Sequence, residues 1–354
     1  MVDSLSPVLV TGGAGFIGSS FVRHLLGQNQ AIVVLDALTY AGCLDNLTEV
    51  AGAPGYRFVQ GDIADGALVA DLLATVRPRA IVNIAAETHV DRSIDGPAAF
   101  VHSNLVGTAA LLEAARGYWR DLREPARAGF RYVQVSTDEV YGSVVEGASR
   151  EGDPYFPNSP YSASKAGGDH MVRAYHHTYG LPTLVTNGSN TYGPRQFPEK
   201  LIPLHILNAC DGRPLPVFGD GRNQREWLHV EDHCRGIAAV LEKGRPGESY
   251  NVGSGIQRAN LDVVRELCAT LDDLAPRRDG RAHAEAITHV TDRPGHDFRY
   301  SLDCAKLTAE TGWRPQVALV DGLRATVRWY LEHGDWCRAI TEARYDRNRL
   351  GTSL

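Results

Sequence analysis

Short apolar runs alternate with longer amphipathic segments through the first two-thirds of the chain. Because a buried strand needs a short apolar run and a surface helix buries one face at helical spacing, this order predicts repeated strand–helix–strand units. Such units join into a parallel sheet that is covered by helices on both faces. The expected strands span residues 8–10, 31–36, 57–62, 80–86, 130–135 and 182–187, and the expected helices span 16–26, 66–75, 98–116 and 161–179.

After about residue 190 the alternation stops, and prolines and glycines crowd together, which predicts loops and short elements. Residues 227–230 and 249–252 are expected strands, the second returning to the main sheet, and residues 260–272 and 320–332 are expected helices. We therefore expect a first domain over residues 1–189, with returning segments near 227–253. A smaller mixed domain over 190–340 and a polar tail over 341–354 complete the predicted organisation.

The bulk composition excludes several classes of protein. A formal net charge of −6 argues against non-specific binding to nucleic acid, and no apolar run is long enough to span a membrane. The segment before the first expected strand is short and polar, so we expect no signal peptide. The six cysteines are scattered and do not have the spacing of metal ligands. We expect a cytoplasmic protein that binds no nucleic acid, no membrane and no metal ion.

A glycine-rich segment, TGGAGFIG at residues 11–18, follows the first expected strand and opens the first expected helix. Gly12 permits a tight turn, Gly15 lets a pyrophosphate approach the backbone, and Gly18 lets the helix pack on the sheet. Asp36 ends the second expected strand, where a carboxylate accepts from ribose hydroxyls and repels a 2′-phosphate. The pattern predicts NAD rather than NADP; Asp62 could bind the adenine amino group or could be a solvated turn residue.

Two adjacent carboxylates, Asp138 and Glu139, follow the fifth expected strand, at the edge where parallel sheets bind ligands. Alone, such a pair could simply cap the next turn. However, Tyr161 and Lys165 follow at a spacing that places them on one face of a helix. A neighbouring ammonium group lowers the pKa of a phenol, so this pair predicts a tyrosine that acts as a base, with a lysine that also holds the nicotinamide ribose.

The segments TGGAGFIG, AAETHVDRS and YSASK, with Asp36 and Asp62, resemble the extended short-chain dehydrogenase/reductase family. Within that family, STDEVYG, SPYSASKAGGDH, FPEKLIP, RNQREWLHVEDH and DRPGHDFRYSLD resemble the dTDP-glucose 4,6-dehydratases over residues 8–330. The segment STDEVYG distinguishes the dehydratases from related epimerases, which share the fold and the Tyr/Lys pair but lack the Asp-Glu pair. The resemblance implies an α/β fold: a Rossmann-type doubly wound parallel sheet with a smaller, mixed C-terminal substrate domain.

The resemblance also implies a lyase that converts dTDP-D-glucose to dTDP-4-keto-6-deoxy-D-glucose in deoxysugar biosynthesis. Tyr161 would take the proton of the C4 hydroxyl while NAD takes the C4 hydride, and Thr137 would hydrogen-bond the C4 oxygen. Glu139 would then remove the C5 proton, Asp138 would protonate the departing C6 hydroxyl, and the hydride would return to C6. Two carboxyl groups in one desolvated site do not easily both ionise, so one can be an acid beside a base.

Further contacts are implied by the same resemblance. The catalytic set would be Thr137, Asp138, Glu139, Tyr161 and Lys165. NAD would contact Gly12, Gly15, Phe16, Ile17, Gly18, Asp36, Ala37, Leu38, Thr39, Asp62, Ile63, Ala85, Ala86, Ser103, Tyr161, Lys165 and Thr191. The nucleotide sugar would contact Thr88, Thr137, Asn190, Lys200, Leu201, Pro216, Phe218, Arg225, Asn260, Arg293 and His296.

Two departures leave the nucleotide and the sugar open. Thr191 replaces an asparagine that the family commonly has at the nicotinamide end, and Arg195 replaces a tyrosine. The alternatives are therefore another nucleotide-sugar enzyme, such as a UDP-hexose 4,6-dehydratase, 4-epimerase or decarboxylase, and a non-catalytic NAD-binding sensor.

The resemblance and an excess of apolar side chains on the helices over 98–116 and 161–179 also predict a homodimer. The two helices of each subunit would pack as a four-helix bundle. The apolar side chains in question are Ala109, Leu111, Leu112, Ala115, Tyr118, Met171, Val172, Ala174 and Tyr175.

Overall fold

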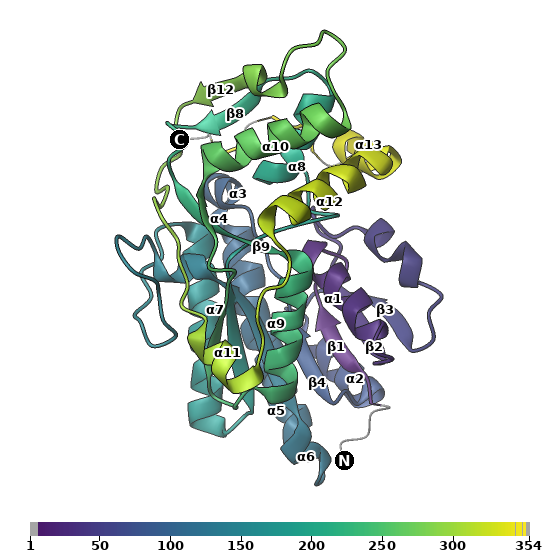
Figure 1. The fold of residues 1–354 in the computed structure, drawn as a ribbon. Helices are drawn as coiled ribbons and strands as arrows, with labels where there is room; N and C mark the ends of the chain where they lie inside the picture. Colours follow the sequence, from purple (N-terminus) through teal and green to yellow (C-terminus); the bar gives the residue numbers. More distant parts are fainter. Residues whose placement is uncertain (1–5, 344, 349, 352–354) are drawn as a thin grey trace.

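The computed structural model describes residues 6–343, 345–348 and 350–351. At its centre lies a seven-stranded sheet in the order β10-β6-β5-β4-β1-β2-β3, in which every neighbouring pair is parallel (Figure 1). The predicted doubly wound α/β fold is confirmed, and β10 returns to this sheet as expected. The strands are β1 (Val8–Thr11), β2 (Ile32–Asp36), β3 (Tyr56–Gln60), β4 (Ala80–Asn83), β5 (Arg131–Thr137), β6 (Thr183–Gly188) and β10 (Ser249–Val252).

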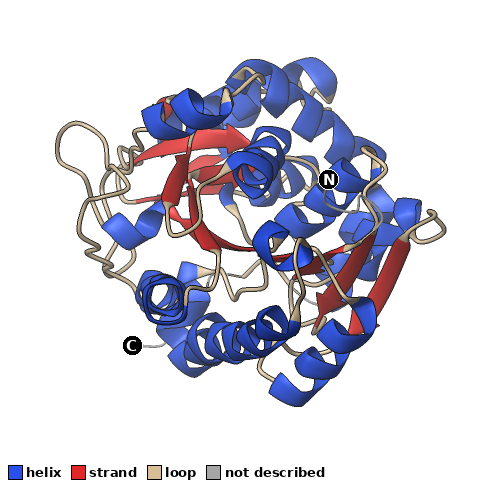
Figure 2. Ribbon diagram, turned by 90° about the horizontal axis from the view of Figure 1, so that it is seen from below, coloured by secondary structure: helices blue, strands red, loops and turns tan. Residues whose placement is uncertain are grey.

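Helices cover both faces of the sheet, and each face has its own apolar core (Figure 2). Alternate residues of β1 enter different cores, because successive side chains of a strand point to opposite faces: Val8 and Val10 enter one and Leu9 the other. One core is covered by α1 (Phe16–Leu26), α9 (Val230–Lys243) and α11 (Ala305–Thr311), the other by α2 (Gly66–Val76), α5 (Thr108–Asp121) and α7 (Pro160–Tyr179).

The helix expected over residues 98–116 is not one regular helix. It consists of α4 (Pro97–Phe100), a π-helical segment η2 (Val101–Gly107) and α5, and it follows the short helix α3 (Val90–Asp95). Inside the π-helical segment, Asn104 is buried and exchanges two hydrogen bonds with the backbone of Glu87 while also donating to Ser164 of α7. π-Helical turns are frequent at functional sites, and this one fixes the chain beside the strand end of β4.

The second half of the chain builds a smaller region above the carboxyl ends of the strands (Figure 1). It contains a three-stranded sheet in the order β11-β9-β7 and a two-stranded sheet of β12 and β8. The strand expected at 227–230 is therefore in this small sheet and not in the main one. The strands are β7 (Asn190–Tyr192), β8 (Leu215–Phe218), β9 (Gln224–His229), β11 (Gln257–Ala259) and β12 (Ile287–Val290).

Helices are more frequent in this half than the sequence led us to expect. Helices α10 (Asn260–Leu274) and α12 (Leu319–Glu332) were predicted, whereas α8 (Leu201–Cys210), α9, α11 and α13 (Gly334–Ala343) were not. The buried face of α9 includes Asp232 and His233 among its apolar positions, which hides the helical pattern. Short turns η1 (Leu44–Val50), α6 (Ala126–Gly129), η3 (Asp138–Tyr141) and η4 (His283–Ala286) complete the elements.

The tail expected over residues 341–354 begins as the last turn of α13. Tyr345 is then buried and packs on Phe197, with ring centroids 6.2 Å apart. The expectation for residues 344, 349 and 352–354 concerns positions outside the described residues. Within the described ranges, no helix has the length and apolarity required to cross a membrane.

Candidate active site

The glycine-rich turn after β1 forms a cradle in which side chains would collide. Gly12 has a φ of +68°, and a Cβ there would lie 2.6 Å from the backbone of Ala85. A Cβ on Gly18 would lie 2.0 Å from the carbonyl oxygen of Gly12. The turn therefore leads directly into the N-terminus of α1, where free N–H groups and the helix dipole favour a phosphate.

Asp36, at the end of β2, fixes this cradle as well as facing the cavity beside it. Its two carboxylate oxygens accept from the N–H groups of Ala14 and Leu38, both at 2.8 Å. Burial raises the pKa of Asp36, and these two hydrogen bonds oppose that shift. An acid in this place suits the ribose hydroxyls of NAD and disfavours a 2′-phosphate.

One cavity runs from this cradle along the carboxyl ends of the strands to Tyr161. Of the residues predicted to contact NAD, all but Leu38 and Lys165 line it. The buried Asn190 Oδ1 and His233 Nε2, which also belong to lining residues, have no hydrogen-bond partner within the protein. A buried polar atom without a partner is costly, so such atoms indicate places where a polar ligand binds. The glycine cradle, the Asp36 carboxylate and these polar atoms without partners fit a dinucleotide.

Thr137, Asp138 and Glu139 lie where β5 gives way to the turn η3. Thr137 Oγ1 accepts from the Glu139 N–H and donates to Asp138 Oδ1, both at 3.3 Å. Asp138 is only 3% exposed, and its second oxygen, Oδ2, has no hydrogen-bond partner. Asp138 therefore does not cap the turn, because a capping carboxylate would accept from backbone N–H groups and here the Thr137 side chain accepts instead.

The two acids have different electrostatic surroundings. The pKa of Asp138 is raised well above its usual value, first by burial and then by the charges of Glu139 and Glu226. Burial also raises the pKa of Glu139, but Arg293, Arg225 and Lys200 lower it. Carboxylates outnumber cations around Asp138 and cations outnumber carboxylates around Glu139, although burial still leaves the pKa of Glu139 raised. When two neighbouring acids have surroundings that separate their pKa values, the first is suited to be the acid and the second the base.

Tyr161 and Lys165 are both buried, but the predicted effect of the lysine on the tyrosine is not found in the protein alone. The Lys165 ammonium donates to the carbonyl oxygen of Val135 at 2.8 Å. The pKa of Tyr161 is raised, first by burial and then by the charge of Glu139, while a hydrogen bond with Thr137 lowers it. The sequence pattern predicted the spacing of the pair correctly. It carried no information about the burial of Tyr161, which raises the pKa of its hydroxyl.

A second cavity meets the first at Glu139, Asn190, Glu199 and Lys200. Nine of the residues predicted to bind the nucleotide sugar line this second cavity, while Thr88 and Thr137 line the first. The nine are Asn190, Lys200, Leu201, Pro216, Phe218, Arg225, Asn260, Arg293 and His296. The structure therefore brings these nine predicted substrate residues together, although they come from six separate stretches of the chain.

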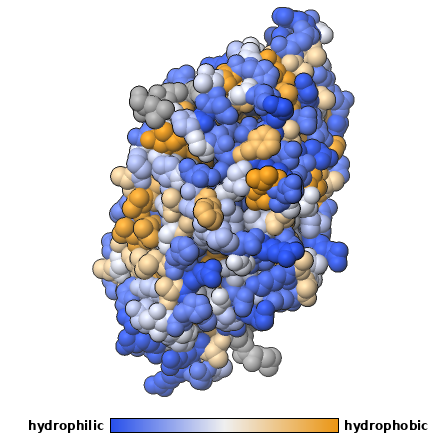
Figure 3. All heavy atoms as spheres, turned by 90° about the vertical axis from the view of Figure 1, so that its left-hand side faces the viewer, coloured by the Kyte–Doolittle hydropathy of each residue, from blue (hydrophilic) through white to orange (hydrophobic). Residues whose placement is uncertain are grey.

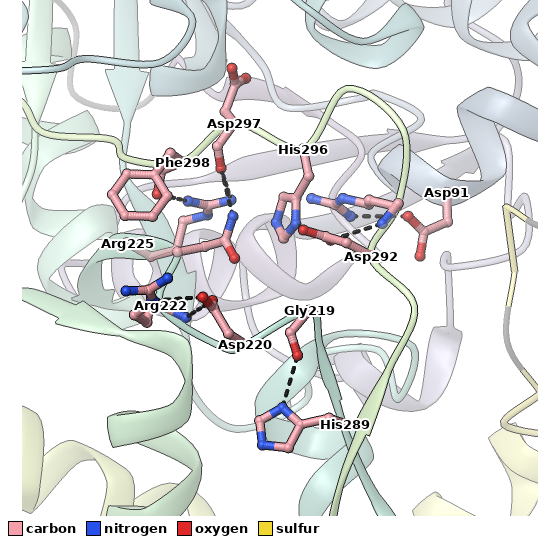
Figure 4. A network of polar contacts seen from close by, with 12 residues as sticks. Asp91, Gly219, Asp220, Arg222, Arg225, His289, Asp292, His296, Asp297 and Phe298 are labelled. Carbon is pink, nitrogen blue, oxygen red and sulfur yellow. Dashed lines mark hydrogen bonds and ion pairs between the residues drawn. The ribbon is translucent and has the colours of Figure 1, made fainter.

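Figure 4 shows how the cations of the second cavity are held. Arg225 donates to the carbonyl oxygens of Asp297 at 2.8 Å and Phe298 at 3.2 Å, so its positive charge has no carboxylate partner there. Arg293 pairs with Asp91 at 3.0 Å, and its buried Nε has no hydrogen-bond partner. His296 contacts Asp292 at 2.6 Å, and burial lowers its pKa to about 4. The incompletely neutralised charges of Arg225 and Arg293 suit a diphosphate, whereas His296 is a neutral hydrogen-bonding group at neutral pH.

Several charged residues of the site were missed in the sequence. Glu199 has a fully buried side chain that accepts from Tyr40 at 2.8 Å and pairs with Arg92 at 2.7 Å. His89, Asp91 and Glu87 also line the two cavities. The segments AAETHVDRS and FPEKLIP contained these residues, but nothing in the sequence showed that the two segments meet.

Comparisons with known proteins agree with this geometry. The family model described as GDP-mannose 4,6 dehydratase matches residues 9–326. A dTDP-glucose 4,6-dehydratase of Xanthomonas campestris pv. campestris is 54% identical over 347 residues, which are 98% of this chain and 99% of the relative. One of Neisseria meningitidis serogroup B is 51% identical over 350 residues, covering 98% and 99%. The chain belongs to the dTDP-glucose 4,6-dehydratase family.

The similar solved structures include dehydratases and also epimerases that share the fold. The dTDP-glucose 4,6-dehydratase DesIV of Streptomyces venezuelae, solved with NAD bound, is 49% identical. It has a TM-score of 0.86, with 94% of this chain and 99% of that chain covered. A UDP-glucuronic acid 4-epimerase of Bacillus cereus is 27% identical, has a TM-score of 0.81 and covers 92% and 99%. The backbone is similar in both, so the fold alone does not distinguish a dehydratase from an epimerase.

The cradle gives a direct test of cofactor binding. In Gly18→Ala, the new methyl group would push against the Gly12 carbonyl and displace the turn that holds the pyrophosphate. We expect a loss of NAD affinity of about tenfold or more, equivalent to ~1.4 kcal/mol. Isothermal titration with NAD measures it. Gly52→Ala is the matched control, because a Cβ there would meet no atom within 4 Å; equal affinities in both variants would contradict the assignment.

Proposed function

We propose that this chain is an NAD-dependent dTDP-glucose 4,6-dehydratase that converts dTDP-D-glucose to dTDP-4-keto-6-deoxy-D-glucose. The observation that carries the proposal is the Asp138–Glu139 pair, placed where the dinucleotide cavity meets the cation-lined cavity. Loss of water from C5 and C6 of a sugar requires a base and an acid together. An epimerase that only oxidises and reduces C4 has no use for either, and a non-catalytic sensor needs none of the catalytic set.

The first proton transfer is assigned to Tyr161. Its hydroxyl lies in the first cavity near Thr137, which can hydrogen-bond the same C4 oxygen and polarise the ketone. When bound, NAD supplies the acceptor and later the donor of the hydride. Lys165 is buried, and it lies one helical turn after Tyr161 on the same face of α7.

The elimination is assigned to the two acids. A ketone at C4 acidifies the C5 proton, and Glu139 is assigned as the base because three cations oppose the rise in its pKa that burial causes, while a raised pKa makes its carboxylate more basic. Asp138 donates the proton with which the C6 hydroxyl leaves as water, because burial and two neighbouring carboxylates favour its protonated form. The two functions depend on their surroundings rather than on a difference in chemistry between the side chains.

The diphosphate and the nucleoside are assigned to the second cavity. Lys200, Arg225 and Arg293 surround it, and His296 packs edge-on against Phe218 with ring centroids 6.2 Å apart. Lys200 is held by a hydrogen bond of 2.8 Å to the carbonyl oxygen of Thr88, which links it to the sugar end. The relatives named as acting on dTDP-glucose favour thymidine diphosphate over uridine diphosphate as the carrier.

The product test distinguishes the candidate functions. We expect that dTDP-glucose yields a 4-keto-6-deoxy product, seen by NMR, and that catalytic NAD suffices because the hydride is returned in each turnover. A preference for UDP-glucose would indicate a UDP-hexose dehydratase, and formation of dTDP-galactose without loss of water would indicate an epimerase. Stoichiometric consumption of NAD, or binding without any turnover, would contradict the proposal.

Substitutions at the acids test the division of the chemistry. Glu139→Gln should permit oxidation of C4 but block removal of the C5 proton, so that the absorbance of reduced nicotinamide accumulates with substrate. Asp138→Asn should slow the loss of water while C5 still exchanges with solvent deuterium. Tyr161→Phe should give no reduced nicotinamide. Each loss should be about a hundredfold to ten-thousandfold; near-normal turnover in both acid variants would leave the pair as a turn cap.

We also propose a cytoplasmic homodimer, although on a corrected surface. Leu111, Leu112, Ala115 and Val172 are buried in the subunit's own core and cannot face a partner. Other apolar side chains on the same helices remain open: Val101 is 46%, Val106 49% and Tyr179 48% exposed. Figure 3 shows hydrophobic patches among hydrophilic groups on one face of the subunit.

The dimer is tested by its mass in solution. Wild-type protein should sediment at twice the chain mass at micromolar concentration, and Val106→Arg should shift it toward the monomer because a charge would be buried against the partner. Val320→Arg is the matched control, since Val320 is 58% exposed on the distant helix α12. A monomeric wild type, or an equal effect of both substitutions, would contradict the proposal.

A further inference from the structure

Asp169 is a buried acid to which the reaction assigns no step. It lies on α7, four residues after Lys165 and therefore one helical turn along the same face. It is 0% exposed, and its Oδ2 accepts from the Ser136 hydroxyl at 2.6 Å. Its other oxygen, Oδ1, has no hydrogen-bond partner. Keeping a carboxyl group in such a place is costly unless a charge nearby compensates it.

The compensating charge is Lys165. Burial lowers the pKa of the Lys165 ammonium, and the carboxylate of Asp169 raises it. In return, Lys165 is the strongest influence that lowers the pKa of Asp169, which burial raises to about 6. The lysine itself is only 4% exposed and donates to the carbonyl oxygen of Val135, on the strand that ends at Thr137. The ammonium of Lys165 and the carboxylate of Asp169 thus each favour the charged form of the other.

Other groups around the acid do not replace this partner. Arg173 and the neighbouring hydroxyl group of Tyr155 lower the pKa of Asp169 less than Lys165 and Ser136 do. The remaining titratable groups that respond to Asp169 are tyrosines, whose neutral hydroxyls carry no compensating charge at neutral pH. They are Tyr132 of β5, Tyr141 of η3, Tyr155 of the following loop and Tyr161 of α7.

We propose that Asp169 is a positioning residue for the reaction, whose buried carboxylate keeps Lys165 in its charged ammonium form behind Tyr161. The proposal rests on the proposed dehydratase function. Asp169 touches neither cavity and acts through Lys165, while its bond to Ser136 ties α7 to the residue preceding Thr137. Without the carboxylate, the buried lysine would lose its proton at a lower pH, and the positive charge beside the catalytic tyrosine would be lost with it.

The test is the pH dependence of kcat for dTDP-glucose in the NAD-loaded enzyme. Asp169→Asn preserves the shape of the side chain and removes its charge, so the alkaline fall in kcat should move to lower pH by about one unit. Ser136→Ala is the matched control, because it removes the 2.6 Å hydrogen bond but leaves the charge of Asp169 in place. The fall in kcat of Ser136→Ala at alkaline pH should coincide with that of the wild type.

A double-mutant cycle gives a second measurement, which does not require that the alkaline fall in kcat be observed. Asp169→Asn should lower kcat at pH 8 in the wild-type background and have little further effect in Lys165→Met, because the group through which it acts is already gone. Equal factors in both backgrounds, or superimposed pH profiles of Asp169→Asn and wild type, would overturn the inference. A wild type that forms no 4-keto product would instead refute the proposed function, so the two failures are distinguishable.

Discussion

The cost of burying a charged carboxyl group controls this active site. The buried Asp138 and the half-buried Glu139 are consecutive residues directly after β5, so close together that two negative charges would repel each other. The surroundings decide which one ionises. Glu226, the next residue after Arg225 on β9, is buried beside Asp138 and accepts from the N–H groups of Gly255 and Leu302, so it remains a fixed acceptor. In the proposed mechanism, two carboxyl groups thereby differ enough to act as an acid and a base.

The two-part architecture follows from this requirement. The acids and the dinucleotide cradle follow β5 and β1 at the carboxyl ends of the main sheet, and helix α7 beside the sheet supplies the tyrosine. The smaller region supplies Arg225 and Arg293, whose charges serve two purposes: they suit a diphosphate and they favour the ionised form of Glu139. Binding a nucleotide sugar and preparing the base are therefore achieved by the same cations, which explains why the two cavities meet at Glu139 and Lys200.

The sequence predicted what depends on local pattern. The strand and helix order of the first half, the glycine turn and the Tyr161/Lys165 spacing are all local, and the structure contains each of them. Helix α9 was missed because buried Asp232 and His233 interrupt its apolar face, and Glu199 was missed because its partner Arg92 lies 107 residues away. The raised pKa of Tyr161 could not be predicted either, because burial depends on how distant segments close over the site.

The proposed division of the chemistry requires that Asp138 be protonated at neutral pH while Glu139 is ionised, and infrared difference spectroscopy tests this requirement most directly. The spectrum of the wild type minus that of Asp138→Asn at pH 7 should contain the C=O stretching band of a protonated carboxyl group. The corresponding difference with Glu139→Gln should contain carboxylate bands instead. A carboxylate signal for Asp138 at pH 7, or a protonated signal for Glu139, would contradict the account.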